Sequence, residues 1–132
     1  MKFFNLLAKS TVVALSLVAF SNANAATERE MQIGFSDAYI PSGFDSNSDT
    51  FVVASGLFPN GCYRWKEAKV NHTGVTTHEI NASAAVSQGM CIMVLVPFTK
   101  EIHLGKLEKG THQVRLMNGD GTYIEKTLTI EE

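Results

Sequence analysis

The sequence predicts an all-β fold, an antiparallel β-sandwich of seven or eight strands that carries one disulfide. Short runs that alternate apolar and polar residues fill most of the chain, and this alternation is the period of a β-strand. Turn-forming residues separate the runs at short intervals, as they do in sandwiches. After residue 25 no window keeps a 3.6-residue apolar period for three turns, and residues 82–86 allow one helical turn at most. With 132 residues, 45% of them hydrophobic and 18% charged, the chain fits one folded domain.

The first three expected strands are residues 31–36, 51–54 and 62–70. Residues 31–36 alternate apolar with small or polar side chains. Residues 51–54 (FVVA) are rich in β-formers, and the run ends at a glycine. In residues 62–70 (CYRWKEAKV), Tyr63 and Trp65 fall on one face of the strand.

A turn at residues 71–74 (NHTG) separates the third strand from a fourth at residues 75–82. The fourth strand places His78, Ile80 and Ala82 on one side. Residues 90–98 (MCIMVLVPF) are apolar at successive positions, which is typical of a strand covered on both faces. We therefore expect 90–98 to be the central strand, with Pro97 at its end, where a missing amide donor matters least.

The last three expected strands follow the same two-residue period. Residues 101–104 and 113–116 alternate polar with apolar side chains. Residues 118–121 (NGDG) form the clearest hairpin turn in the chain. Residues 124–130 place their apolar side chains on one face, interrupted by Lys126. The C-terminal part is therefore predicted to be a β-hairpin.

Residues 1–25 are typical of a secretory signal peptide. Two lysines near the start precede the apolar stretch 11–20 (TVVALSLVAF), and small residues at 23–25 (ANA) suit a cleavage site. The apolar stretch is shorter than the ~20 residues that span a bilayer. We therefore expect an exported protein, periplasmic or extracellular, whose folded domain is residues 26–132.

The charge balance excludes several classes of partner. The formal net charge is −2. Removing residues 1–25 takes away two of the 11 basic residues and none of the 13 acidic ones, so the net charge becomes −4. Mild acidity gives no electrostatic attraction to nucleic acid or anionic lipid. We expect a monomer that does not insert into a membrane after removal of the leader, and that needs no cofactor.

Cys62 and Cys91 are the only cysteines, so export predicts a unique disulfide between them. In a plain meander of strands 62–70, 75–82 and 90–98 the two cysteines would lie about 9.6 Å apart. A disulfide needs Cα atoms about 4.4–6.8 Å apart. The two strands must then pair directly or lie in opposite sheets. We favour the cross-sheet arrangement, with Trp65 close by.

Several sequence runs resemble small exported bacterial immunoglobulin-like domains. They are residues 56–63 (GLFPNGCY), 89–91 (GMC), 97–98 (PF) and 104–110 (LGKLEKG). Members of that group share a G-L-P-x-x-C-Y strand, a second cysteine before P-F and an L-G-x-L-x-x-G turn, and this chain inserts Phe58 before the proline. The resemblance implies an immunoglobulin-like β-sandwich of two sheets and carries over no catalytic residue.

Residues 45–49 (DSNSD) start like a calcium loop, with oxygen ligands at Asp45, Asn47 and Asp49. An EF-hand requires glycine next and glutamate at its twelfth position, where this chain has Thr50 and Gly56. We expect a solvated loop, and a bound cation is the alternative.

The remaining chemistry is sparse. Of the four histidines, His72 falls in a turn and His78, His103 and His112 fall in strands, where we expect them to be surface or half-buried residues. His78 begins an H-E-x-x-H pattern, but Ala82 replaces its second histidine. No G-x-S-x-G nucleophile motif is present. We therefore assign no catalytic residue and no metal ligand, although the fold could gather the histidines into a cluster.

The connection 37–50 is the longest between the predicted strands, and it carries Tyr39, Ile40 and Phe44 among polar residues. These apolar side chains either cover a sheet edge or form a contact surface for a protein partner. The sequence thus predicts a non-enzymatic binding or structural module that presents loops from a disulfide-stapled sandwich. The alternatives are a loop-based protease inhibitor and a metal-assisted hydrolase that uses the histidines.

Overall fold

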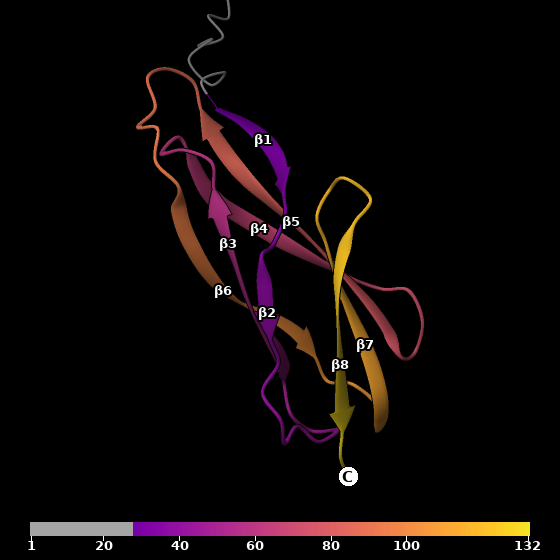
Figure 1. Cartoon of the computed structure of the whole chain (residues 1–132). Helices are drawn as coiled ribbons and strands as arrows, with labels where there is room; N and C mark the ends of the chain where they lie inside the picture. Colours follow the sequence, from indigo (N-terminus) through magenta and orange to yellow (C-terminus); the bar gives the residue numbers. More distant parts are fainter. Residues whose placement is uncertain (1–27) are drawn as a thin grey trace, which may run out of the picture.

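A computed structural model describes residues 28–132 as eight strands in two sheets (Figure 1). The predicted signal peptide, residues 1–25, lies outside the described residues. Between residues 28 and 132 no helix is long and apolar enough to cross a membrane. The strands are β1 (Glu28–Ile33), β2 (Asp37–Tyr39), β3 (Thr50–Phe58), β4 (Tyr63–His72), β5 (Thr77–Ser87), β6 (Val96–Gly105), β7 (Gly110–Met117) and β8 (Tyr123–Ile130).

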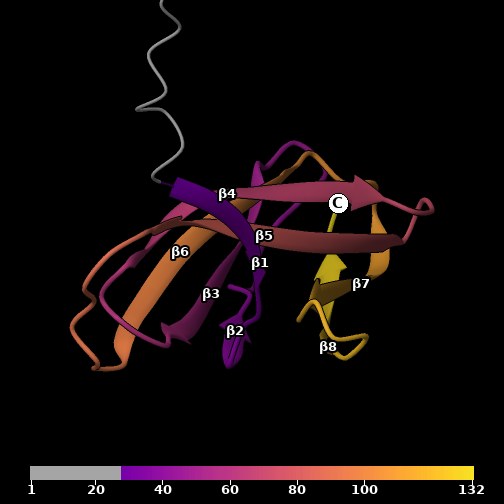
Figure 2. The same cartoon turned by 90° about the horizontal axis from the view of Figure 1, so that it is seen from above.

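One sheet contains β2, β3 and β6, and the other contains β1, β4, β5, β7 and β8. Figure 2 shows β1, β4 and β5 side by side, with β3 and β6 running at a steep angle to them. Strand β5 has β4 along one edge. On its other edge β1 pairs antiparallel with residues 82–87 and β7 pairs parallel with residues 77–80. The predicted β-sandwich with one disulfide is confirmed, and the β5–β7 pairing makes the sheets mostly rather than wholly antiparallel.

The core lies between the two sheets, and the alternating residues of each strand fill it. Every second side chain of β5 is buried, from His78 to Val86. Alternate residues of β3 and β7 face it in the same way. Tyr63 and Trp65 are partly buried and pack against this core. The two-residue period is therefore the feature of the sequence that determines which side of each strand is buried.

The prediction of a covered strand at 90–98 is wrong. Strand β6 begins only at Val96, and residues 88–95 form the connection between β5 and β6. A run that is apolar at every position carries no alternation, so it does not distinguish a covered strand from an apolar loop.

Two smaller expectations are also corrected. Residues 82–86, where one helical turn was allowed, belong to β5 because the strand continues to Ser87. The turn expected at 71–74 begins later, because β4 extends to His72 and pairs that residue with His78.

Candidate functional site

The connection 88–95 forms an exposed apolar loop, which we call the apolar loop. It contains no charged residue. Its exposed apolar side chains are Met90, Ile92, Met93, Val94 and Leu95. The least exposed of them still shows 53% of its surface. Contiguous apolar surface of this kind marks interaction sites in soluble proteins more often than it marks ordinary surface.

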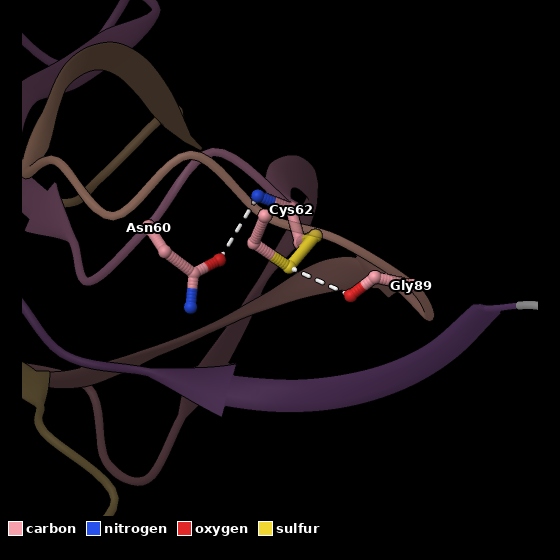
Figure 3. Close-up of a disulfide and its surroundings, with 4 residues drawn as sticks. Asn60, Cys62 and Gly89 are labelled. Carbon is pink, nitrogen blue, oxygen red and sulfur yellow. Dashed lines mark hydrogen bonds between the residues drawn. A yellow bond between two sulfur atoms is a disulfide. The ribbon is translucent and has the colours of Figure 1, made fainter.

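The base of the apolar loop is fixed to the connection between β3 and β4 (Figure 3). The Cys62–Cys91 disulfide joins the two connections, with the Cα atoms 5.2 Å apart. The amide of Gly61 donates a hydrogen bond to the carbonyl of Ile92 at 2.9 Å, and the amide of Ser87 donates one to the carbonyl of Cys62 at 3.0 Å. Asn60 accepts a bond from the Cys62 amide at 2.9 Å. The base of the loop is therefore fixed, while its apolar side chains are exposed to solvent.

This disulfide connects two of the four places where the chain changes sheets. The β3–β4 connection leaves the three-stranded sheet, and the β5–β6 connection returns to it. The predicted cross-sheet arrangement is confirmed for strands β4 and β6, but both cysteines lie in the connections that precede these strands. The ring centroids of Trp65 and Phe98 lie 5.7 Å apart, so Trp65 of β4 packs against β6 of the other sheet.

The three predicted contact residues lie away from the apolar loop and differ in exposure. Tyr39, in β2, is 65% exposed. Ile40 and Phe44 are half-buried and pack against the core. The ring of Phe44 meets that of Phe51 edge-on, with centroids 5.3 Å apart. Of the three, Tyr39 alone offers most of its side chain to a partner.

The acidic residues of the 45–49 segment turn toward protein donors. Asp45 Oδ1 accepts hydrogen bonds from the Asn47 amide and the Ser48 hydroxyl, both at 2.9 Å. The bond from Ser48, followed by that from Asn47, holds the pKa of the Asp45 carboxyl below its usual value. Asp49 instead contacts the ring of His103 at 2.9 Å. Asp45 and Asp49 thus serve two different local structures.

Three of the four histidines form a row that runs from the surface at His72 into the sandwich, which we call the histidine row. His72 Nδ1 lies 2.6 Å from His78 Nδ1, and His78 Nε2 lies 2.9 Å from His112 Nδ1. His112 Nε2 reaches the backbone carbonyl of Glu108 at 2.6 Å. His78 and His112 are buried, so the expectation of surface or half-buried rings is wrong for both. His103 is separate and exposed, beside Asp49 and Glu101.

The Glu108 carbonyl fixes the proton positions along the histidine row. A carbonyl only accepts, so His112 Nε2 must donate, and its neutral Nδ1 then accepts from His78 Nε2. His78 Nδ1 in turn accepts from His72 Nδ1. Burial, followed by repulsion from His72 and His112, lowers the pKa of His78 to about 4. When all three rings are neutral, each of the three hydrogen bonds therefore has one donor and one acceptor.

A sequence signal for this row exists. His72 and His78 are directly opposite each other in the β4–β5 register, with five residues between them. A turn at 71–74 places His72 in the loop, so this prediction does not pair His72 with His78. His112 joins them through the parallel β5–β7 contact, in which His78 is opposite Val114. No local pattern predicts that long-range pairing.

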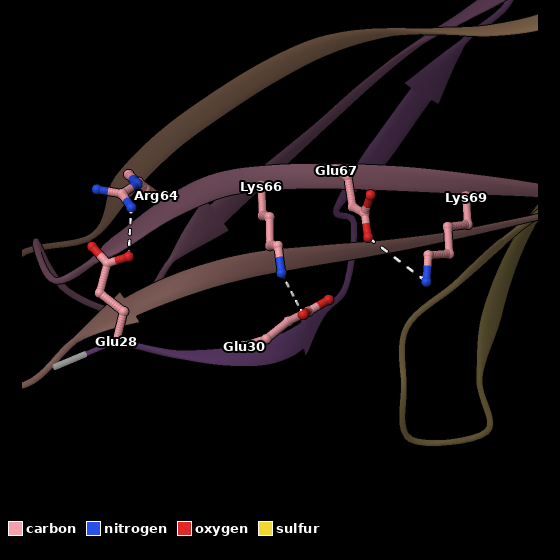
Figure 4. Close-up of polar contacts among 6 residues, drawn as sticks. All are labelled: Glu28, Glu30, Arg64, Lys66, Glu67 and Lys69. Atoms are coloured by element: carbon pink, nitrogen blue, oxygen red, sulfur yellow. Dashed lines mark hydrogen bonds and ion pairs between the residues drawn. The ribbon is translucent and has the colours of Figure 1, made fainter. Parts of the chain in front are cut away.

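The outer face of β5 carries small residues, and charged side chains of β1 and β4 meet across it (Figure 4). Arg64 and Glu28 lie 2.6 Å apart, and Lys66 and Glu30 lie 2.5 Å apart. Ala85 of β5 pairs with both Glu30 and Arg64, leaving room above it for the long side chains. The bond to Lys66 is the main cause of the lowered pKa of the Glu30 carboxyl. These charges balance one another and leave no surface of a single sign.

Among residues 28–132, no group of three or more His, Cys, Asp or Glu side chains is arranged around a common metal position. A family model described as the ORF11 beta-sandwich domain matches residues 52–130, more than half of the chain. The search of curated proteins finds no match, and neither does the search of solved structures.

Proposed function

The chain belongs to the family of ORF11 beta-sandwich domains, and we propose that it works as a non-enzymatic binding module whose contact surface is the apolar loop. The observation that carries this proposal is the exposure of five apolar side chains between residues 90 and 95 on a loop whose base is fixed by a disulfide. A fixed base reduces the entropy lost when a loop is ordered by binding.

The occupant that fits this loop is an apolar groove on a protein partner. Met90 and Met93 have unbranched side chains, which adapt to irregular apolar surfaces. The loop lacks the lysine, arginine and aromatic residues that favour a membrane interface. The net charge of −4 after removal of residues 1–25 also repels anionic lipid.

Export is part of the same proposal. The signal-peptide pattern of residues 1–25 supports it. The Cys62–Cys91 disulfide also supports it, because such bonds persist in oxidising compartments such as the periplasm and the extracellular space. We further propose that the sandwich is of the immunoglobulin-like type, on the motif resemblance and the two-sheet architecture. The parallel β5–β7 pair is then its distinguishing feature.

To test the contact surface, a photo-crosslinking amino acid replaces Met93 in the full-length chain. The chain is expressed in the organism that naturally produces it, so that the partner is present. The matched control carries the same amino acid at Val75, which is 68% exposed in the β4–β5 turn. These two positions lie at opposite ends of the β4–β5 hairpin (Figure 1). We expect a discrete crosslinked protein from position 93 and none from position 75.

Two further measurements define the occupant. With the crosslinking amino acid at position 93, substituting Ile92→Ser and Val94→Ser together should abolish the crosslinked complex, whereas Val75→Ser should preserve it. Flotation with zwitterionic and anionic vesicles should leave the purified protein unbound. Equal crosslinking from both positions, or vesicle binding that depends on Met93, would overturn the proposed protein contact.

A further inference from the structure

We propose that His72 and His78 form a binding site for a divalent copper ion at the end of the β4–β5 hairpin. The site is independent of the apolar loop, which lies at the other end of that hairpin (Figure 1). It goes beyond a binding role for the loop, because it assigns a metal to side chains with no part in that role.

The two donor atoms have a separation close to that of two nitrogens on one copper ion. His72 and His78 are paired directly across the hairpin, and their Nδ1 atoms lie 2.6 Å apart. A metal held by two nitrogens at about 2.0 Å needs them about 2.8 Å apart at the right angle of a tetragonal copper site. A tetrahedral zinc site needs about 3.3 Å. The observed separation is closer to the copper geometry, and small rotations of the exposed His72 ring supply the difference.

The ring of His78 is held in place by hydrogen bonds on the side away from His72. A histidine that binds a metal usually donates its other ring N–H to a fixed acceptor, which sets its tautomer. His78 Nε2 donates to His112, and His112 donates to the Glu108 carbonyl. His78 Nδ1 therefore carries no proton, and its lone pair, which accepts from His72 in the metal-free row, would bind the copper ion. The two buried rings thus act as an oriented ligand with its support, and we regard His112 as a positioning residue.

An ion can reach the two histidines from the surface of the protein. A surface pocket between the β4–β5 turn and the β6–β7 connection is lined by both histidines, Lys106 and Glu108. An ion entering from this pocket reaches the two histidine residues, and water would fill its remaining coordination positions. Lys106 opposes the charge of the ion and Glu108 favours it, so the side chains around the pocket nearly cancel.

Proton balance is simple at neutral pH. In the metal-free row His72 carries its proton on Nδ1, which donates to His78. Copper binding requires that this proton leave Nδ1 and that Nε2 of the exposed ring take one from water. His72 stays neutral, and binding releases no net proton.

The test uses copper sulfate alone as the probe, with the disulfide-bonded protein after removal of the leader. Competition with a chromophoric chelator should give one tight copper equivalent per chain. Electron paramagnetic resonance should show coupling to two ring nitrogens. Changing His72→Ala should weaken copper binding at least tenfold and remove one nitrogen coupling. Changing the exposed His103→Ala is the matched control and should leave both measurements unchanged.

Several results would overturn the assignment. One is a His72→Ala protein that binds copper as tightly as the parent, and another is an equal loss in His103→Ala. Tighter binding of zinc than of copper in the same competition would reject the tetragonal geometry. The spectrum of the unsubstituted protein gives a test that needs no variant, since a signal without two imidazole couplings contradicts the site.

Discussion

The ring of Phe98 lies directly over Gly56, its partner in the β3–β6 register, with no space for a side chain between them. A Cβ atom at residue 56 would stand 2.5 Å from Cζ of Phe98. The ring cannot easily move aside, because it stacks on Phe58 at 4.5 Å and packs against Trp65. Gly56 is therefore required by packing, since its backbone conformation is one that other residues adopt.

We predict that Gly56→Ala destabilises the domain by about 1–3 kcal/mol, the usual cost of overpacking a core. Urea unfolding of the purified domain measures the change. The matched control is Gly74→Ala, whose Cβ would meet its nearest atom, in Thr77, at 4.0 Å. The control should unfold like the parent, and equal midpoints for all three proteins would contradict this packing.

The disulfide should contribute strongly to stability. Closing the loop between Cys62 and Cys91, which are 29 positions apart, stabilises the fold by about 3.6 kcal/mol in the chain-entropy model. Reduction with dithiothreitol, or Cys62→Ala with Cys91→Ala, should therefore lower the melting temperature markedly. Thiol titration of the denatured, unreduced protein should find no free sulfhydryl. Two reactive thiols would show that the staple is absent.

Stability should fall as the medium becomes acidic, in the protein kept metal-free with a chelator. The pKa of His78 is lowered from 6.5 to about 4, so the unfolded chain takes up a proton at higher pH than the folded one. The stabilisation is complete above pH 6.5 and is lost as the pH falls toward 4, by about 3 kcal/mol in total. The groups facing His78 are His72, His112 and, across the pocket, Lys106 and Glu108.

Urea midpoints between pH 7.5 and 5 isolate this effect, because the carboxyls whose pKa is lowered titrate below that range. The parent and His103→Ala should lose stability in parallel. A flat profile between pH 7 and 5 would mean that His78 is hydrated or accepts a proton without penalty.

Two of the predicted contact residues should behave differently when truncated. Phe44→Ala removes a half-buried ring that packs on Phe51, and it should cost about 1–2 kcal/mol, less than the ~3–5 kcal/mol of a fully buried ring. Tyr39→Ala removes an exposed ring and should leave the midpoint unchanged. Thermal melting compares them, and a stable Phe44→Ala protein would show that this ring does not cover the core.

The alternation of apolar and polar residues predicts the strands that have one face buried and the other face exposed to solvent. The buried positions of β5 and β7, such as Ile80 and Leu116, follow from the period alone. Residues 90–95 have the composition of a covered strand, yet they lie on the surface. The disulfide could be predicted because only two cysteines exist. The row from His72 to His112 could not, since it depends on a strand pairing between distant segments.

Strand β5 carries β1 and β7 end to end along a single edge, and this has a consequence for assembly. The backbone of residues 82–87 is paired on that side only by β1. If β1 detaches, those amide and carbonyl groups become a bare ladder that another extended chain can join. Strand β1 therefore covers this edge of β5 as well as extending the sheet. Shortening β1 should favour the exchange of strands between copies of the chain.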